Sequence, residues 1–343
     1  MKQRIFGLLA LMIQAILGAQ NTNIPPIRYL KLHDTDIIKN NNSVKKIKSI
    51  TSYITTDSKR QPSLTSNYNE NGDLIEVISY ENSKKNKVTT YQKNNNETRE
   101  KNEFYKTDGT KTNNYIETVR TKNPTTNKEI VTLTYYPDKN SQQQEILYNA
   151  NGKVLELKDY QYDRVVRSTG YLYQDSLLTK EIFSAYQYTT PNQKPKISTS
   201  EVVYKYDKQG NMLEILSKDH YLFFYKNNKL VKEQYNNSGS LKFDGEINYI
   251  YNSENKVIKI QERLSNGCKM ESNIEYDKNK FKKVISIPEN NTQYCYFRYA
   301  TFMPDDKQTV YNYAYDSNNN LIQFITEKNG KTVNMYEYEI QYF

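Results

Sequence analysis

The stretch Tyr206-Asp207-Lys208-Gln209-Gly210-Asn211-Met212-Leu213-Glu214-Ile215 contains the pattern that decides the fold of this chain. A short acidic side chain such as that of Asp207 accepts hydrogen bonds from nearby backbone N–H groups and so starts a turn. Gly210 takes the positive φ that closes a bulged hairpin loop without steric cost. The aliphatic pair Met212-Leu213 then begins a returning strand, so the stretch predicts a β-hairpin led by a tyrosine.

The same order of an aromatic residue, a polar turn and an aliphatic pair recurs along the chain. Clear copies begin at Tyr68, Tyr148, Tyr235, Tyr251 and Tyr315, and weaker copies begin at Tyr105, Tyr225 and Tyr276. The residues expected to form these turns include Gly72, Gly152, Gly239 and Asp316. The copies are irregularly spaced, which is not expected of a solenoid with a constant period. The pattern predicts an all-β chain, an antiparallel meander of irregular hairpin repeats that forms a twisted, elongated sheet.

The composition is unusual for a chain of 343 residues. Hydrophobic residues make up 36%, the mean hydropathy is -0.91, and there are 33 tyrosines and no tryptophan. Disordered chains are poor in aromatic and β-branched residues, whereas this chain is rich in both. We therefore expect a β-rich protein with a thin core, in which tyrosine rings supply much of the apolar area.

The first 19 residues have the features of a secretory signal peptide. Lys2 and Arg4 precede an apolar run that ends in the small residues of Leu17-Gly18-Ala19, which predicts cleavage between Ala19 and Gln20. Gln20 stands where a bacterial lipoprotein carries its cysteine, so lipid anchoring at this position is not expected.

The mature chain is expected to consist of an irregular lead-in, residues 20–43, and one β-hairpin repeat domain, residues 44–343. No segment after the signal is long and apolar enough to span a membrane as a helix. We therefore expect an exported protein that is periplasmic, held at the cell surface or secreted. Removal of Lys2 and Arg4 with the signal lowers the formal net charge from +9 to +7. Because the chain has no dense basic block, nucleic acid is not an expected partner.

The chain has two cysteines, Cys268 and Cys295, and an exported location favours a disulfide between them. The local spacing argues against that pairing. If residues 276–281 and 287–292 form successive hairpin turns, Cys295 lies level with Asn273, roughly 17 Å along the strand and about 9 Å across it from Cys268. A disulfide needs α-carbons within about 7 Å of each other. The spacing therefore predicts free thiols.

The Tyr-Asp-x-x-Gly-Asn/Arg-Leu pattern resembles the YD repeat of the Rhs family of bacterial cell-surface and secreted proteins. The match is best at Tyr206, Asp207, Gly210, Asn211 and Leu213. Degenerate copies extend the resemblance over roughly residues 60–343. The resemblance implies long antiparallel sheets that can coil into a shell, together with an association with carbohydrate. Since the repeats run to Phe343, it implies stand-alone repeats without a toxin domain.

Residues with catalytic or metal-binding chemistry are sparse. The two histidines, His33 and His220, lie in the expected lead-in and beside an expected turn, and the cysteines have no metal-ligand spacing. We expect no catalytic, cofactor-binding or metal site, and no enzymatic activity. Tyr336 and Tyr338 alternate along the last strand and share one face, so they are the candidate ligand face.

Two classes of function follow from these observations. The first is a non-enzymatic binding or scaffolding module of the cell envelope, with carbohydrate as the first ligand and another envelope protein as the alternative partner. The second is an outer-membrane β-barrel, which the signal, the many strands and the terminal Phe343 favour. Against it, Tyr336, Tyr338 and Tyr342 are out of phase with Phe343, and the strands are rich in Lys, Glu and Asn for a lipid-facing band. The ligand, the oligomeric state and the closure of the sheet stay open.

Overall fold

The computed structural model describes residues 47–56, 59–189, 194–236, 243–289, 294–297 and 301–343. Within these ranges the chain forms 24 strands and no helix, so the predicted all-β class is confirmed. In the described part of the chain no helix has the length and apolar character needed to cross a membrane. The expected signal peptide and lead-in lie outside the described residues.

The strands are mostly long and follow one another closely. The first eight are β1 (Ile47–Thr56), β2 (Lys59–Tyr68), β3 (Leu74–Glu81), β4 (Lys84–Lys93), β5 (Glu97–Tyr105), β6 (Lys111–Asn123), β7 (Lys128–Tyr136) and β8 (Asn140–Tyr148). The next eight are β9 (Val154–Gln161), β10 (Arg164–Gln174), β11 (Leu177–Gln187), β12 (Lys196–Tyr206), β13 (Met212–Leu216), β14 (His220–Lys226), β15 (Lys229–Asn236) and β16 (Gly245–Tyr251). The last eight are β17 (Val257–Leu264), β18 (Lys269–Asp277), β19 (Lys280–Glu289), β20 (Cys295–Tyr296), β21 (Thr301–Phe302), β22 (Thr309–Tyr315), β23 (Leu321–Lys328) and β24 (Lys331–Tyr342).

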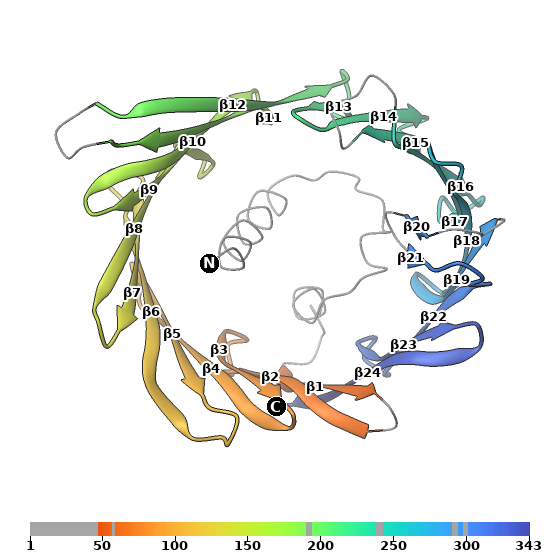
Figure 1. Ribbon diagram of the computed structural model, residues 1–343, viewed down its shortest axis with the longest axis horizontal. Coiled ribbons are helices and arrows are strands. Elements are labelled where there is room, and N and C mark those ends of the chain that lie inside the picture. The colour runs from red at the N-terminus through yellow and green to blue at the C-terminus, as the bar shows by residue number, and fades with distance from the viewer. Residues whose placement is uncertain (1–46, 57–58, 190–193, 237–242, 290–293, 298–300) are drawn as a thin grey trace.

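Twenty-two of these strands form one closed barrel (Figure 1). Each strand pairs antiparallel with the next along the chain, and β19 pairs with β22 across the connection that contains β20 and β21. The ring closes where β24 pairs with β1, with Ile340 opposite Ile50 and Tyr338 opposite Ser52. The predicted antiparallel meander is therefore present, but the sheet is a closed ring and not the elongated sheet that the sequence pattern predicts.

Regular bulges account for the curvature that closes the ring. The register shifts by one residue close to many of the turns, for example between Lys205 and Tyr206, between Ile250 and Tyr251, and between Ala314 and Tyr315. A bulge bends its strand and increases the local twist, so repeated bulges add up to a closed shape. The sequence pattern predicts where the turns lie. It does not predict the overall curvature that the bulges produce together.

The hairpin at Asp207 has the geometry on which the repeated motif depends. One carboxylate oxygen of Asp207 accepts hydrogen bonds from the backbone N–H groups of Gln209 and Asn211, at 2.8 and 2.9 Å. Gly210 has a φ of +82°, a conformation that glycine adopts at little cost. The same two side-chain-to-backbone bonds occur at Asn69, Asn149, Asn252 and Asp316.

These five turns lie on one rim of the barrel. Each connects an even-numbered strand to the following odd-numbered strand, namely β2 to β3, β8 to β9, β12 to β13, β16 to β17 and β22 to β23. Because neighbouring strands are antiparallel, such turns share one end of the sheet, which we call the motif rim. The longer connections, from β11 to β12, from β15 to β16 and from β19 to β22, belong to the opposite end, which we call the loop rim.

Lysines join neighbouring turns of the motif rim. The ammonium group of Lys256 lies 5.6 Å from the ring centroid of Tyr276 and donates a hydrogen bond of 2.5 Å to the carbonyl of Lys278 in the next turn. Lys153, Lys229 and Lys280 contact the rings of Tyr173, Tyr251 and Tyr315 in the same way. Each cation therefore combines an aromatic contact with a carbonyl contact and ties one hairpin to the next.

The small sheet of β20 and β21 identifies the inner face of the barrel. It lies within the outline of the ring (Figure 1), and its neighbour Phe297 and its Phe302 pack with Cys268, Cys295 and Met270 in one buried cluster. Met270 therefore points inward. Directly opposed residues of neighbouring strands share a face, so the cross-strand pairs carry this assignment from strand to strand around the ring.

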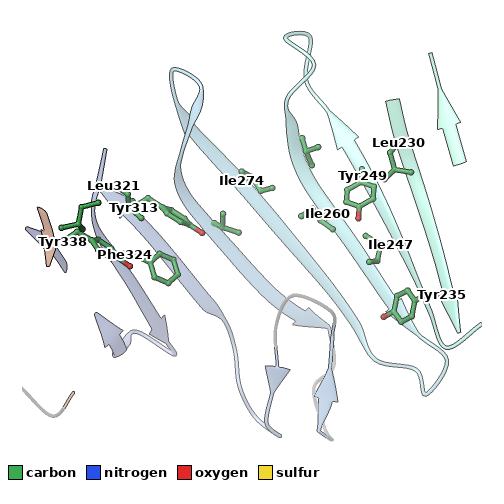
Figure 2. Close-up of a cluster of buried hydrophobic side chains, with 13 residues drawn as sticks. Leu230, Tyr235, Ile247, Tyr249, Ile260, Ile274, Tyr313, Leu321, Phe324 and Tyr338 are labelled. Atoms are coloured by element: carbon green, nitrogen blue, oxygen red, sulfur yellow. The ribbon is translucent and has the colours of Figure 1, made fainter. Parts of the chain in front are cut away.

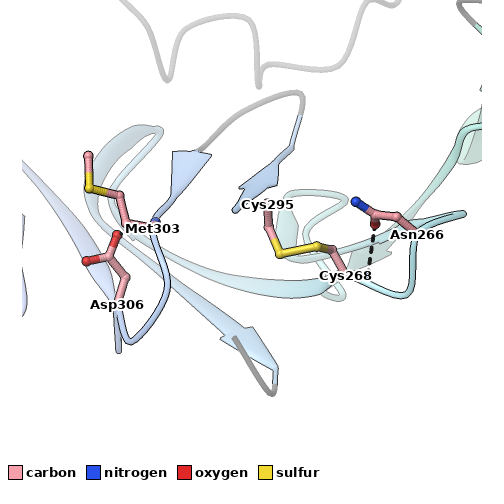
Figure 3. Close-up of a disulfide and its surroundings, with 5 residues drawn as sticks. All are labelled: Asn266, Cys268, Cys295, Met303 and Asp306. Carbon is pink, nitrogen blue, oxygen red and sulfur yellow. Dashed lines mark hydrogen bonds between the residues drawn. A yellow bond between two sulfur atoms is a disulfide. The ribbon is translucent and has the colours of Figure 1, made fainter. Parts of the chain in front are cut away.

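The two cysteines form a disulfide, which corrects the prediction of free thiols (Figure 3). Their α-carbons are 5.9 Å apart. The error lay in the assumed turn at residues 287–292, because β19 continues to Glu289 and Pro288 pairs with Met270. The chain then leaves the wall, and Cys295 pairs with Phe302 in the separate small sheet instead of lying beside β18. This excursion brings Cys295 back to the turn before β18.

Candidate functional site

The inner wall of the barrel is the candidate functional site. Strands spaced about 4.8 Å apart and tilted by about 40° give a 22-stranded barrel roughly 45 Å across. Side chains fill the interior of an eight-stranded barrel but not of one this wide. The inner wall therefore surrounds a space that its own side chains cannot occupy.

From β15 through β24 to β1 the inner wall is aromatic and aliphatic (Figure 2). The buried members of this arc, which we call the aromatic arc, are Ile50, Leu230, Tyr235, Ile247, Tyr249, Val257, Ile260, Ile274, Val284, Tyr313, Leu321, Phe324 and Tyr338. Ile247 and Ile260 are 0% exposed although the barrel wall is a single sheet. Neighbouring tyrosine rings on the same face supply the covering area that a second layer gives other folds.

Tyrosine hydroxyls hold these rings against the wall. Tyr206, Tyr251 and Tyr276 donate hydrogen bonds to the backbone carbonyls of Leu178, Leu230 and Val257, at 2.8, 2.6 and 2.8 Å. Each bond runs from the last residue before a motif-rim turn to the preceding hairpin. The leading tyrosine of the repeat thus covers apolar surface and satisfies its hydroxyl at the same time.

Four glutamates of the inner wall accept hydrogen bonds from tyrosines. The pairs are Tyr148 with Glu129 at 2.7 Å, Tyr204 with Glu181 at 2.8 Å, Tyr235 with Glu262 at 2.6 Å and Tyr249 with Glu233 at 2.7 Å. Glu181, Glu233 and Glu262 are almost completely buried. Burial raises the pKa of Glu181, and the hydrogen bond from Tyr204 opposes that shift. Burial, with the charge of Glu181, raises the pKa of Tyr204.

Between β4 and β10 the inner wall mixes buried apolar residues such as Val131, Ile146 and Leu157 with hydrogen-bonded polar residues, and we call this part the polar arc. Thr89 donates a hydrogen bond of 2.8 Å to Asn102, whose amide donates one of 2.8 Å to Glu100. Further along, Gln144 donates a hydrogen bond to Asp159 at 2.8 Å. Arg120 lies 3.4 Å from Glu129. The inner wall therefore offers an apolar arc and a hydrogen-bonding arc to the same interior.

A hollow of about 810 Å³ opens at the motif-rim end of the polar arc. Its inner-face lining includes Tyr91, Lys93, Thr98, Glu100, Thr118 and Arg120. Turn residues complete it, among them Asn69, Asn71, Asn94 and Asn95. Burial, with a smaller effect of the Glu100 charge, raises the pKa of Tyr91 to about 12, so its phenol stays protonated at neutral pH.

The outer face carries ion pairs instead of a continuous apolar surface. Representative pairs are Lys101–Glu103, Lys128–Glu145, Lys180–Glu201, Lys232–Glu246, Lys259–Glu271 and Arg60 with Glu337 and Glu339. They belong to strands in every part of the ring. Single exposed apolar residues such as Leu172 and Phe224 lie between them. The inner and outer faces of the wall thus differ in the types of side chain that they carry.

The expected ligand residues Tyr336 and Tyr338 lie on the inner face. Tyr338 is 6% exposed and belongs to the aromatic arc, and the ring of Tyr336 lies 6.1 Å from that of Phe324. Both side chains therefore pack within the wall. His220, at the start of β14, lies 2.7 Å from Glu214 on the outer face.

The expected turn tyrosines Tyr68, Tyr148, Tyr206 and Tyr315 each end a strand that leads into a motif-rim turn. Tyr235 instead lies within β15, opposite Gly245. Gly239, the expected cleavage residues Ala19 and Gln20, and His33 lie outside the described residues. Among the residues that the structure describes, no group of three or more His, Cys, Asp or Glu side chains has the arrangement needed to hold a metal ion.

Comparisons with known proteins give distant structural likenesses. No family model and no curated protein matches the sequence. A porin-like protein from Bacteroides uniformis superposes with a TM-score of 0.26 and 12% identity over 86% of this chain and 98% of that one. One from Bacteroides vulgatus gives 0.24 and 9% over 87% and 99%. The Photorhabdus luminescens Tc holotoxin pore with the TccC3-D651A mutation gives 0.23 and 10% over 80% of this chain, which spans 20% of that chain. TM-scores of this size do not establish a shared fold.

The buried glutamates and the rim hollow are functional candidates that sequence reasoning missed. A signal for the glutamates exists, because Glu233 stands two residues before Tyr235 and Glu262 two residues after Ile260, in phase with the apolar positions of their strands. The hollow has no comparable signal. Its residues come from β3 to β6 and from two turns, and only the folded register brings them together.

Proposed function

We propose that this chain is a non-enzymatic, exported β-barrel that works in water and binds its ligand on the inner wall. The observation that carries the proposal is the division of side chains between the two faces of one sheet. In the aromatic arc tyrosines and aliphatic residues face inward, and on the outer face paired charges alternate with single apolar residues such as Leu172 and Phe224. This division fits a barrel whose outer face contacts water and whose inner wall presents the aromatic and polar arcs to a ligand.

The outer face argues against lipid contact. On β17 and β18 the outward positions are Lys259, Gln261, Arg263, Lys269, Glu271, Asn273 and Glu275. A Lys or Arg on the lipid face of a barrel costs about 2–4 kcal/mol at the bilayer midplane. Ion pairs such as Lys259–Glu271, at 2.8 Å, are instead typical of a surface in water.

An outer-membrane β-barrel is the second candidate, and the closure of the sheet favours it. An even number of antiparallel strands in a closed ring is the architecture that such proteins share. The expected signal peptide is equally consistent with this location. The two candidates differ in one requirement, because a membrane barrel needs an apolar outward band about 25 Å tall.

Carbohydrate is the first ligand class for the inner wall, and another envelope protein is the second. The resemblance to YD repeats favours carbohydrate, and the partly buried tyrosine rings of the inner wall, such as Tyr311 and Tyr336, are suited to either. The loop rim, with its longer connections, is the side from which a large ligand enters, since binding residues concentrate on loops that a rigid scaffold positions.

The test combines a glycan array with a pull-down from envelope extract, both with the mature protein purified without detergent. Binding on the array, or a stable partner in the pull-down, supports a binding module. A protein that dissolves without detergent yet is silent in both measurements contradicts it.

A further inference from the structure

The hollow at the motif rim brings the carboxylate of Glu100 together with two cations, Lys93 and Arg120, on the inner face. Glu100 on β5 is opposite Thr118 on β6, and Thr98 is opposite Arg120. Glu100 and Arg120 are therefore diagonal neighbours, whose α-carbons in antiparallel strands are about 7–8 Å apart. No ion pair joins them within the described part of the chain, because Arg120 contacts Glu129 and Glu100 accepts a hydrogen bond from Asn102.

Arg120 keeps donors for a ligand. Within the described residues its ion-pair contact joins one terminal nitrogen to Glu129 at 3.4 Å, and the side chain is 47% exposed. A guanidinium carries five N–H donors in a planar fork that matches a carboxylate. A ligand carboxylate can therefore bind Arg120 while the contact with Glu129 persists.

Glu100 has the complementary surroundings for a cation. Tyr91 on β4 lies directly opposite Glu100. A carboxylate and an aromatic ring therefore line the same part of the hollow. An ammonium group gains both a charge-assisted hydrogen bond and a cation–π contact in such a place. The amides of Asn71, Asn94 and Asn95 line the same hollow, whereas that of Asn69 bonds within its own turn.

We propose that this hollow binds a short peptide by its two charged ends, with the ammonium group at Glu100 and Tyr91 and the carboxylate at Arg120. The spacing selects the length, because two extended residues span about 7 Å, close to the separation of the α-carbons of Glu100 and Arg120. The asparagine amides then face the peptide bond. This inference rests on the proposed function, since it needs a water-filled interior, and it names a ligand class for one part of the inner wall.

The experiment titrates the mature protein with the dipeptide Ala-Ala by calorimetry, in parallel with N-acetyl-Ala-Ala and with Ala-Ala amide. We expect Ala-Ala to bind and each capped peptide to bind about tenfold more weakly, as the loss of one charge-assisted contact implies. Glu100→Gln abolishes the discrimination against the acetylated peptide alone. Arg120→Gln abolishes the discrimination against the amide alone.

Two matched variants serve as controls. Glu145→Gln changes an outer-face glutamate of β8, and Arg167→Gln changes an inner-face arginine of β10, and neither residue lines the hollow. Both should bind Ala-Ala like the wild type. Equal affinity for all three peptides, or no heat from Ala-Ala at millimolar concentration, overturns the inference even if the variants fail to fold, because these results need only the wild-type protein. A protein that dissolves without detergent but ignores Ala-Ala leaves the proposed function standing, whereas one that requires detergent contradicts the proposed function separately.

Discussion

The ring of Tyr235 lies directly over the backbone of Gly245. A Cβ atom added to Gly245 would lie 2.3 Å from Cζ and 2.4 Å from the hydroxyl oxygen of Tyr235, too close for any side chain. The two residues are opposite each other on β15 and β16, and the same hydroxyl donates to Glu262 on β17. Because Gly245 has no side chain, the ring of Tyr235 can cross β16 at this position and reach the buried carboxylate of Glu262.

Gly245→Ala should destabilise the protein by about 1–3 kcal/mol, because the added methyl group displaces the ring and breaks the bond to Glu262. Urea denaturation of wild type and variant measures the difference. Gly170→Ala is the matched control, since a Cβ there meets nothing within 4 Å and its φ is not in the left-handed region. Equal loss of stability in both variants would contradict the role of Gly245.

Asp207→Ala should lower stability by about 0.5–1.5 kcal/mol, because the backbone N–H groups of Gln209 and Asn211 lose their shared acceptor. Asp207→Asn should cost less, since asparagine makes the same two bonds at Asn149. Thermal denaturation of the three proteins ranks them. If Asn and Ala are equally destabilising at this position, the side-chain oxygen is not what forms the turn.

Peptide mapping without reduction should find Cys268 and Cys295 in one cross-linked fragment. The double variant Cys268→Ser/Cys295→Ser should lose up to about 3.5 kcal/mol of stability, the loop-closure value for a separation of 27 residues. It should also make Phe302, which is buried, accessible to a hydrophobic dye. Two free thiols in the mature exported protein would refute the placement of β20.

The raised pKa of Glu181 predicts a dependence of stability on pH. Since its pKa is higher in the folded than in the unfolded state, the folded protein binds this proton more tightly, and the associated stability falls as the pH rises above about 4.5. Glu181→Gln keeps an acceptor for Tyr204 and removes the charge. We expect the variant to gain stability relative to wild type between acidic and neutral pH, as followed by urea denaturation at several pH values. Glu201→Gln, on the outer face of β12, should not show this gain.

The sequence predicts those features of the fold that depend on contacts between residues close together in the chain. The all-β class follows from alternating strands, and a turn such as that at Asp207 depends on contacts within five residues. Closure of the ring depends on Ile50 meeting Ile340 and on the sum of many small bends. The disulfide depends on where β19 ends, which Pro288 does not reveal, because this proline continues the strand. Local patterns also leave open which face of the sheet turns inward.

Carbonate extraction of envelopes that contain the mature protein tests the central claim most directly, because it asks whether the charged outer face meets water or lipid. We predict that the protein is released into the supernatant without detergent and that it stays monodisperse and does not float with lipid vesicles. Retention in the membrane pellet, together with flotation with vesicles, would contradict the account and favour the outer-membrane barrel.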